Sequence, residues 1–278
     1  MTTVCVTGAS GRAGRVVVRE LLEHGHQVVA TDLRRPGADL GVEVLLADLT
    51  DFGQAVEALD NAEAVVHLAN IPAPGIHPPA TTFTANIAMN YNVFSAATRL
   101  GHRRVVWASS ETTLGLPFDT PPRYAPVDED HYPFPTTSYA LSKVATETVA
   151  GQFAAWSGIP FVALRFSNIF DPAEYPRLAR VWSDPLARKW NLWGYVDQRD
   201  VAAACRQALA AKVSGSTSYI IAAADTVMNR PSARLLEEVF PGTPLTREVG
   251  EYETLLSVDR AGRDLGFTPR HSWRQHLS

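Results

Sequence analysis

Short apolar runs alternate with longer amphipathic segments along much of the chain. The apolar runs have the length of buried β-strands, and they predict strands at residues 4–6, 27–31, 42–47, 64–68, 104–108 and 161–166. The amphipathic segments predict helices at residues 15–22, 51–59, 82–100, 136–156 and 197–211. Because strands that alternate with helices form a parallel sheet covered on both faces, we expect an α/β fold, a Rossmann-type doubly wound parallel sheet.

The alternation weakens beyond Asn168. Residues 171–193 are rich in Trp, Arg and Pro, and residues 116–135 hold six prolines, which predicts an irregular surface excursion. We predict one more strand at residues 217–222 and cap helices at residues 230–240 and 254–265. We therefore expect a Rossmann domain of residues 1–166, to which residues 197–222 return, and a small subdomain of residues 167–196 and 223–278.

Composition narrows the possible functions. The chain has 278 residues and a net charge of −4 without a block of basic residues, which argues against nucleic-acid binding. No apolar run is long enough to span a membrane and no signal peptide precedes the first strand, so we expect a cytoplasmic protein. The two cysteines, Cys5 and Cys205, are predicted to be small core residues, and the eight histidines lack the spacing of metal ligands.

A glycine-rich turn follows the first predicted strand. Gly8, Gly11 and Gly14 stand between this strand and an amphipathic helix. Such a turn lets the backbone approach a pyrophosphate, which then lies at the positive end of the helix. The sequence therefore predicts a dinucleotide site at the N-terminus of the chain.

Polar residues at the ends of the strands bear on which dinucleotide is bound. Asp32 ends the second strand, where a carboxylate accepts hydrogen bonds from ribose hydroxyls and opposes a 2′-phosphate. This favours NAD over NADP. Arg12, Arg34 and Arg35 lie nearby and provide charge that attracts a 2′-phosphate, although a solvated loop is the favoured interpretation of these arginines.

Tyr139 and Lys143 lie four residues apart on a predicted helix and so share one face. An ammonium group beside a phenol favours the phenolate and lowers the tyrosine pKa. A tyrosine tuned in this way exchanges protons with an alcohol or a carbonyl. Ser110 ends a neighbouring strand at the same edge of the sheet, where its hydroxyl can bind the reacting oxygen.

Together these motifs resemble an extended short-chain dehydrogenase/reductase of the NAD-dependent epimerase/dehydratase type. The resemblance rests on TGASGRAG at 7–14, Asp32, Asp48–Leu49, HLAN at 67–70, Asn86, WASS at 107–110, YALSK at 139–143, LRFSN at 164–168 and YVDQRDVA at 195–202. It implies a cofactor site formed by Gly8, Ser10, Gly11, Arg12, Ala13, Gly14, Asp32, Leu33, Asp48, Leu49, Leu68, Ala69, Asn70, Tyr139 and Lys143. It also implies that Ser110 polarises the substrate, Tyr139 is the acid/base, Lys143 holds the nicotinamide ribose, and Asn86 holds a water in a proton relay. The two long helices at 82–100 and 136–156 form a dimer interface in many relatives, which implies a homodimer.

Departures from the family pattern indicate a small-molecule substrate without a nucleotide. The stretch Asn168-Ile-Phe-Asp171-Pro172 has aspartate where enzymes acting on nucleotide-sugars have glycine, and the segment that follows it is short. Leu114 likewise replaces a usual tyrosine. The layout is most similar to uronate dehydrogenase-like members, and it implies a substrate site formed by Ser110, Glu111, Thr112, Arg165, Asn168, Tyr175 and Trp182.

Several of these substrate residues have structural alternatives. Glu111 replaces an asparagine and would repel a carboxylate, so a neutral sugar, an aldehyde or ketone, or an amine fits better; alternatively, Glu111 is a rim residue pointing at water. Arg165 binds substrate or forms a structural ion pair. Tyr175, Trp182, Trp190 and Trp193 line the pocket or form a local aromatic core.

These observations predict an NAD(P)-dependent oxidoreductase that transfers hydride between nicotinamide and a small hydroxyl or carbonyl substrate, plausibly a sugar. The alternative is a nucleotide-sugar epimerase or dehydratase that uses NAD transiently, since it needs the same catalytic residues. A third hypothesis is a regulatory protein that senses a dinucleotide without reacting, but relatives of that kind usually lack the tyrosine.

Overall fold

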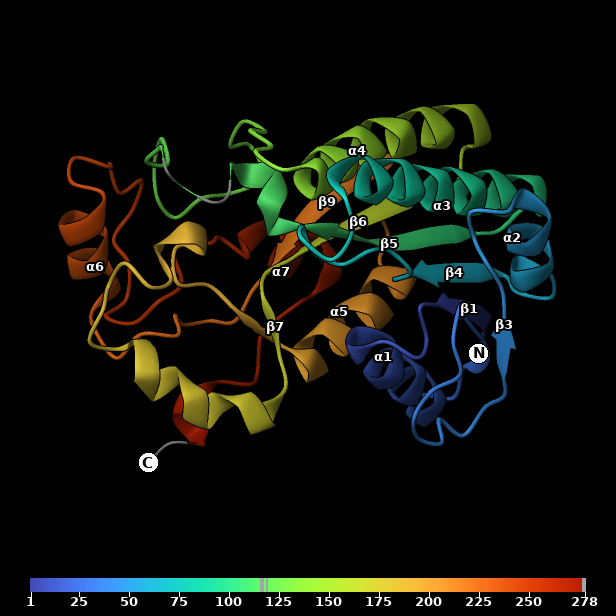
Figure 1. Ribbon diagram of the computed structural model, residues 1–278, viewed down its shortest axis with the longest axis horizontal. Coiled ribbons are helices and arrows are strands. Elements are labelled where there is room, and N and C mark those ends of the chain that lie inside the picture. Colours follow the sequence, from blue (N-terminus) through green and yellow to red (C-terminus); the bar gives the residue numbers. More distant parts are fainter. Residues whose placement is uncertain (116–117, 119, 277–278) are drawn as a thin grey trace.

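A seven-stranded parallel sheet forms the centre of the molecule in the computed structural model, which describes residues 1–115, 118 and 120–276 (Figure 1). The spatial order of the strands is β3-β2-β1-β4-β5-β6-β9. Their bounds are β1 Thr3–Thr7, β2 Gln27–Asp32, β3 Val44–Leu46, β4 Ala64–His67, β5 Arg104–Ser110, β6 Phe161–Phe166 and β9 Ser216–Ile221. The predicted Rossmann-type fold is confirmed. The order reverses between β1 and β4, which is where ligands bind in such sheets.

Helices cover both faces of the sheet. In Figure 1, α3 and α4 lie side by side above the sheet and α1 and α5 lie below it. The helix bounds are α1 Arg12–Glu23, α2 Phe52–Leu59, α3 Pro79–Arg99, α4 Ser138–Ser157 and α5 Gln198–Ala210. Each covered face has its own apolar core, and the fully buried Cys5 and Cys205 belong to these cores as small apolar residues, as predicted.

The remaining elements are η1 Glu111–Leu114, β7 Ile169–Phe170, η2 Pro172–Val181, η3 Lys189–Asn191, β8 Val196–Asp197, α6 Ser232–Val239, α7 Asp259–Leu265 and η4 Trp273–Gln275. Most of them pack around a third apolar cluster in the C-terminal part of the chain, at the left of Figure 1, whereas β8 and α7 contribute apolar side chains to the core on the α1 and α5 side of the sheet. Tyr175 and Trp193 are fully buried in the third cluster. The predicted division into two domains stays a prediction, and its last two residues lie outside the described part of the chain.

One predicted helix is partly wrong. The apolar spacing predicts a helix over residues 254–265, but α7 begins only at Asp259. The preceding residues are extended, because Glu253 bridges to Asp225 and Leu256 to Val127. These long-range backbone contacts override the local pattern. Of the predicted irregular excursion at 116–135, positions 116, 117 and 119 lie outside the described residues.

Candidate active site

A cavity of about 1,200 Å³ lies along the carboxyl edge of the sheet, from the glycine-rich turn to the C-terminal cluster. Its wall includes every residue predicted to bind the cofactor, and these residues come from the ends of β1, β2, β3 and β4 and from the starts of α1 and α4. Of the other predicted site residues, Ser110, Glu111, Thr112 and Asn168 also line it. Asn86, Arg165, Tyr175 and Trp182 lie outside the cavity wall.

The glycine-rich turn has no room for a side chain at Gly8 or Gly14. Gly8 has a φ of +68°, and a Cβ there would lie 2.8 Å from the backbone nitrogen of Ala69. A Cβ on Gly14 would lie 2.0 Å from the carbonyl oxygen of Gly8. Among the residues that the structure describes, no side chain caps the first turn of α1. The backbone N–H groups of this turn are therefore available to a ligand in the cavity, which the start of α1 lines. This backbone cradle fits the pyrophosphate of a dinucleotide.

Asp32 is held at the end of β2 by two backbone donors. Its Oδ2 accepts from the Ser10 N–H at 2.9 Å and its Oδ1 from the Arg34 N–H at 3.1 Å. The Ser10 hydroxyl also donates to the Arg34 carbonyl at 2.7 Å. The carboxylate thus has a defined position beside the glycine-rich turn, where it can accept hydrogen bonds from a ribose.

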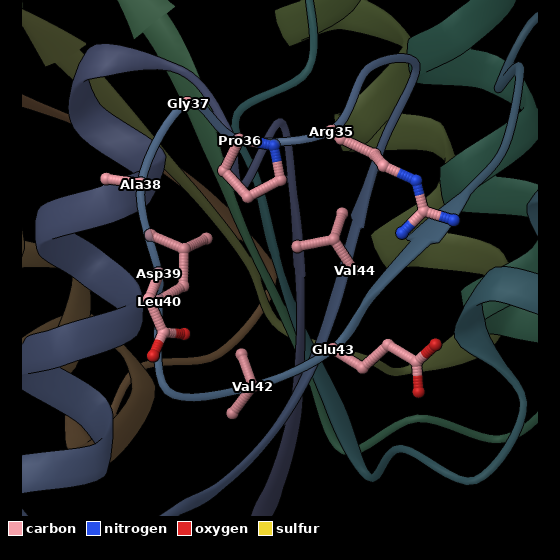
Figure 2. A pocket seen from close by; sticks show the side chains of 9 residues that line it. All are labelled: Arg35, Pro36, Gly37, Ala38, Asp39, Leu40, Val42, Glu43 and Val44. Atoms are coloured by element: carbon pink, nitrogen blue, oxygen red, sulfur yellow. The ribbon is translucent and has the colours of Figure 1, made fainter.

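Two nearby arginines have different surroundings. Arg12 donates to the Ile169 carbonyl at 2.9 Å and to Glu174 at 2.6 Å, while its side chain remains half exposed, so its interpretation as part of a solvated loop stays a prediction. Arg35 lines the main cavity and also a hollow of about 410 Å³ formed by the β2–β3 connection. In Figure 2 the Arg35 guanidinium extends to the side of this hollow away from Asp39.

Ser110 and Tyr139 both line the cavity. The Thr137 hydroxyl accepts from the Ala140 N–H and caps α4, which places Tyr139 in the first turn of the helix. The Ser110 hydroxyl favours the charged form of the Tyr139 phenol and so acts to lower the pKa of Tyr139, against the larger effect of burial. Ser110 also accepts from the Thr112 N–H at 3.2 Å and from its hydroxyl at 3.0 Å. The pair can therefore hold one substrate oxygen between two hydroxyl groups.

Lys143 is buried one turn further along α4. Its ammonium donates to Asn70 Oδ1 at 3.1 Å and to the Ala108 carbonyl at 2.7 Å, and Nζ lies 5.6 Å from the centre of the Tyr139 ring. Burial lowers the pKa of Lys143 to about 7 and raises the pKa of Tyr139 to about 12. The predicted lowering of the tyrosine pKa is therefore wrong for this arrangement, because burial outweighs other effects and the ammonium points at amide and carbonyl oxygens.

Asn86 is fully buried behind the cavity wall. Its Oδ1 accepts from the Ile71 N–H at 2.8 Å, and its Nδ2 donates to the Ile71 carbonyl at 3.2 Å and to the Ser142 hydroxyl at 3.3 Å. These contacts hold the loop that follows β4. Its role in a proton relay stays a prediction.

Glu111 is almost completely buried at the substrate end of the cavity, at 3% exposure, so the interpretation as a rim residue pointing at water is wrong. Its carboxyl group accepts from the Ser167 hydroxyl and, at 3.1 Å, from Asn191 Nδ2. Burial raises the pKa of Glu111 to about 7. Ser167 directly follows β6, and this place at the end of a strand is a signal from which sequence reasoning could have identified it. Asn191 lies in an irregular segment, and no sequence pattern pointed to it.

Three other predicted substrate residues have structural contacts. Arg165 forms a two-pronged ion pair with Glu147, at 2.9 and 2.7 Å, as its structural alternative predicts. The Tyr175 hydroxyl donates to Asp197, and the Trp182 indole N–H donates to the Val227 carbonyl at 3.0 Å. Tyr175 and Trp182 pack in or against the third apolar cluster. Substrate binding by these three residues stays a prediction.

The arrangement of turn, cavity and catalytic residues agrees with the comparison to known families. A model of the NAD dependent epimerase/dehydratase family matches residues 4–222. The chain belongs to this family. The predicted resemblance, an enzyme of the extended short-chain dehydrogenase/reductase type with NAD as cofactor, is confirmed.

Curated relatives include both dehydrogenases and epimerases. The chain is 30% identical to the NAD-dependent glucose-6-phosphate dehydrogenase of Haloferax volcanii, over 64% of this chain and 74% of the relative. It is 24% identical to the UDP-glucose 4-epimerase of Corynebacterium glutamicum, over 96% and 91%. It is 26% identical to the uronate dehydrogenase of Pseudomonas syringae pv. tomato, over 64% and 63%.

Solved structures of this family share the fold. A short-chain dehydrogenase/reductase superfamily protein from Agrobacterium tumefaciens, solved with bound NAD, superposes with a TM-score of 0.74. The match covers 99% of this chain and 94% of that chain at 24% identity. Within residues 1–115, 118 and 120–276, no helix has the length and apolar character needed to cross a membrane.

Proposed function

We propose that this family member is an NAD-dependent oxidoreductase that interconverts a hydroxyl and a carbonyl group on a small, neutral substrate such as a free sugar. The observation that carries the proposal is that Ser110, Tyr139 and Lys143 meet in the same cavity that begins at the glycine-rich turn. Bound NAD supplies the hydride acceptor, and its reduced form the hydride donor. The residues of the chain then have to move one proton and orient one oxygen.

Tyr139 and Ser110 account for these two tasks. In the oxidative direction, the substrate hydroxyl lies between the two side chains, and Tyr139 takes its proton as the hydride leaves the same carbon. Ser110 donates to the carbonyl oxygen that forms. Because burial raises the pKa of Tyr139 to about 12, the phenolate needs the positive charge of Lys143 when the proton moves.

The C-terminal cluster supports a small substrate. The segment after β7 is the place where a nucleotide would need to be enclosed, but Tyr175, Leu178 and Trp193 of this segment are buried in their own apolar core. The Trp193 indole N–H is bonded to the Pro185 carbonyl at 2.8 Å. The segment therefore packs against itself, and Trp190 is the residue from it that reaches the cavity wall.

Glu111 supports a neutral substrate. It lines the cavity beside Ser110, and its carboxyl group accepts hydrogen bonds from Ser167 and Asn191. Each carboxyl oxygen has a further lone pair, which can accept from a substrate hydroxyl or amine. A substrate carboxylate at this place would face a buried acid, and for this reason we do not propose a uronate.

An absorbance screen for reduced nicotinamide tests the proposal. Purified protein is mixed with free sugars, sugar acids, simple alcohols and ketones, with NAD(H) and NADP(H) in parallel. We expect turnover of a neutral hydroxyl or carbonyl compound with NAD(H). Turnover of sugar acids in preference to neutral sugars would contradict the role given to Glu111.

A nucleotide-sugar epimerase or dehydratase is the second candidate. It is favoured by the UDP-glucose 4-epimerase relative, whose match extends over 96% of this chain, whereas the two dehydrogenases match 64%. Such an enzyme regenerates its own NAD. Tightly retained NAD in purified protein, together with no net reduction of added NAD by the screened compounds, would establish this candidate over the first.

We also propose that NAD is preferred over NADP. The support is the position of Asp32, whose carboxylate is oriented by Ser10 and Arg34 at the place where a 2′-phosphate would lie. Isothermal titration with both dinucleotides measures this preference. Equal dissociation constants, or tighter NADP, would contradict it and assign the site to Arg34 and Arg35.

We further propose that two copies associate through α3 and α4. Tyr91, Leu141 and Trp156 are exposed on these helices, at 51%, 46% and 71%. Neither helix turns a charged side chain outward before Arg99, because the two charged residues of α4, Lys143 and Glu147, are engaged inward. Sedimentation should show a dimer that Trp156→Glu dissociates; an unchanged monomer in both proteins would contradict it. The cytoplasmic location stays a prediction.

A further inference from the structure

A chain of buried hydrogen bonds leads from the sheet to Lys143, and the proposed function does not use it. It begins at Thr7 and His67, which are paired across the parallel strands β1 and β4. Both are fully buried. The Thr7 hydroxyl lies 2.6 Å from His67 Nδ1, and His67 Nε2 lies 2.9 Å from Asn90 Oδ1 on α3.

The donors and acceptors in this chain have a single consistent direction. The Thr7 hydroxyl oxygen accepts from the N–H groups of Leu68 and Ala69, at 3.2 and 3.3 Å, so its own proton goes to His67 Nδ1. The imidazole must then carry its proton on Nε2 and donate it to Asn90. Burial lowers the pKa of His67 to about 3, so the ring is neutral.

Asn90 is thereby held in one amide orientation. Its Oδ1 faces His67, and its Nδ2 donates to the Thr146 hydroxyl at 3.1 Å. Thr146 can only accept from Asn90, because its own proton goes to the Ser142 carbonyl at 2.7 Å. Two fixed partners at opposite ends therefore prevent the Asn90 amide from flipping.

The orientation passes to Asn70. Asn90 and Asn70 form a reciprocal amide pair with both distances at 3.1 Å. This pairing, together with a bond from Asn70 Nδ2 to the Ala69 carbonyl, turns Asn70 Oδ1 toward the Lys143 ammonium, again at 3.1 Å. A flipped Asn70 would present its NH₂ group to the ammonium, two donors facing each other.

We propose that His67 and Asn90 are positioning residues, which fix the Asn70 amide as an acceptor and so hold the Lys143 ammonium in place beside Tyr139. The other charged or titratable groups around Lys143 are Glu147 on its own helix, Tyr139 one turn before it and neutral His67 on β4. Within the described part of the chain the ammonium has two acceptors, Asn70 Oδ1 and the Ala108 carbonyl, so a third N–H can face a ribose hydroxyl. The inference rests on the proposed function only for what Lys143 does in catalysis.

The experiment uses the fact that the chain contains three lysines, Lys143, Lys189 and Lys212. With lysine labelled with ¹³C at Cε, NMR follows the titration of each ammonium, and Lys143→Arg assigns the resonance. Asn70→Ala is the reference variant, and it should lower the Lys143 midpoint by about one pH unit because the charged form loses an acceptor. Asn90→Leu and His67→Phe should each lower it by about half a unit or more.

His102→Phe is the matched control. His102 is also a buried histidine, at 2% exposure, but its Nε2 is bonded to the Leu59 carbonyl outside this network. It should leave the Lys143 midpoint unchanged. If Asn70→Ala shifts the midpoint while Asn90→Leu and His67→Phe do not, the two residues only fill space and the inference is overturned.

The dissociation constant of NAD gives a second readout. It should rise about 10-fold in Asn90→Leu and stay within about 2-fold in His102→Phe, as expected when one charged hydrogen bond is misplaced. If a variant fails to fold, the wild-type protein still tests the inference. Its long-range ¹H–¹⁵N spectrum must show His67 protonated on Nε2 and neutral from about pH 5 to about pH 9. A proton on Nδ1 would overturn the inference. Because these measurements need no substrate, they can succeed even if the oxidoreductase assignment fails.

Discussion

The two ends of the active-site cavity are built in different ways. At the cofactor end, Gly8 and Gly14 lie within one strand–turn–helix unit, and Asp32 bonds to Ser10, 22 residues away. At the substrate end, Glu111 is bonded to Ser167 and Asn191, which are 56 and 80 residues away. The first end depends on local backbone geometry, whereas the second depends on packing between distant segments.

This difference has consequences for specificity. A site made of backbone N–H groups recognises what all dinucleotides share, and it tolerates little change because a Cβ on Gly8 or Gly14 would collide with backbone atoms. A site made of side chains from separate segments changes its chemistry with one substitution. The cofactor end thus resembles that of the whole family, whereas the side chains at the substrate end are particular to this chain.

The largest expected effect lies where the two ends meet. Tyr139→Phe removes the hydroxyl that exchanges the proton and should lower kcat by roughly 10²- to 10⁴-fold, while the dissociation constant of NAD changes little. Steady-state kinetics and NAD titration on the same preparation measure both. Near-normal turnover would show that Tyr139 is not the acid/base.

The cofactor end is tested by Gly14→Ala. The added methyl would lie 2.0 Å from the Gly8 carbonyl oxygen, so the turn has to move, at a cost of about 2–4 kcal/mol divided between stability and NAD affinity. Gly151→Ala is the matched control, because within the described residues no atom beyond the neighbouring backbone of α4 lies within 4 Å of its added Cβ. Equal behaviour of the two variants in thermal unfolding and NAD titration would contradict a close-packed turn.

The substrate end is tested by the pH dependence of stability. Burial raises the pKa of Glu111 from 4.5 to about 7, so the folded state binds a proton that the unfolded state releases between these values. The contribution of Glu111 is most favourable below pH 4.5 and falls, by up to about 3 kcal/mol, as the pH rises through the folded pKa of about 7.

Glu111→Gln has no such proton and should therefore gain stability relative to wild type as the pH rises over this interval. Urea unfolding at pH values below, within and above the interval measures the difference. A constant difference between the two proteins at all pH values would mean that Glu111 stays ionised, and that its environment is more polar than the contacts with Ser167 and Asn191 indicate.

The smallest expected effect concerns the link between the two ends. The Arg12–Glu174 pair joins the glycine-rich turn to η2, but the Arg12 side chain is 50% exposed. Solvent screens such a pair, and a double-mutant cycle of Arg12→Met and Glu174→Gln should give a coupling of at most about 1 kcal/mol. A larger coupling, insensitive to salt, would show that the two ends form one rigid unit.

Sequence reasoning was most accurate where the physics is local. The hydrophobic pattern placed the strands of the sheet and helices α1 to α5 to within a few residues, because strands buried on both faces are continuous apolar runs and helices buried on one face have a period of 3.6. The glycine spacing and the separation of Tyr139 from Lys143 indicated the cofactor turn and a shared helix face. Each of these features is contained within a short stretch of chain.

The tertiary structure decided what each polar side chain touches. It turned Glu111 into a buried acid, paired Arg165 with Glu147, and directed Lys143 to Asn70 instead of to the tyrosine oxygen. No period encodes these partners, since each depends on how separate helices and strands pack. Burial then set the pKa values, in the case of Tyr139 in the opposite direction to that predicted. The sequence by itself thus determined the fold and the cofactor class, and the packing determined the charges and contacts that select a substrate.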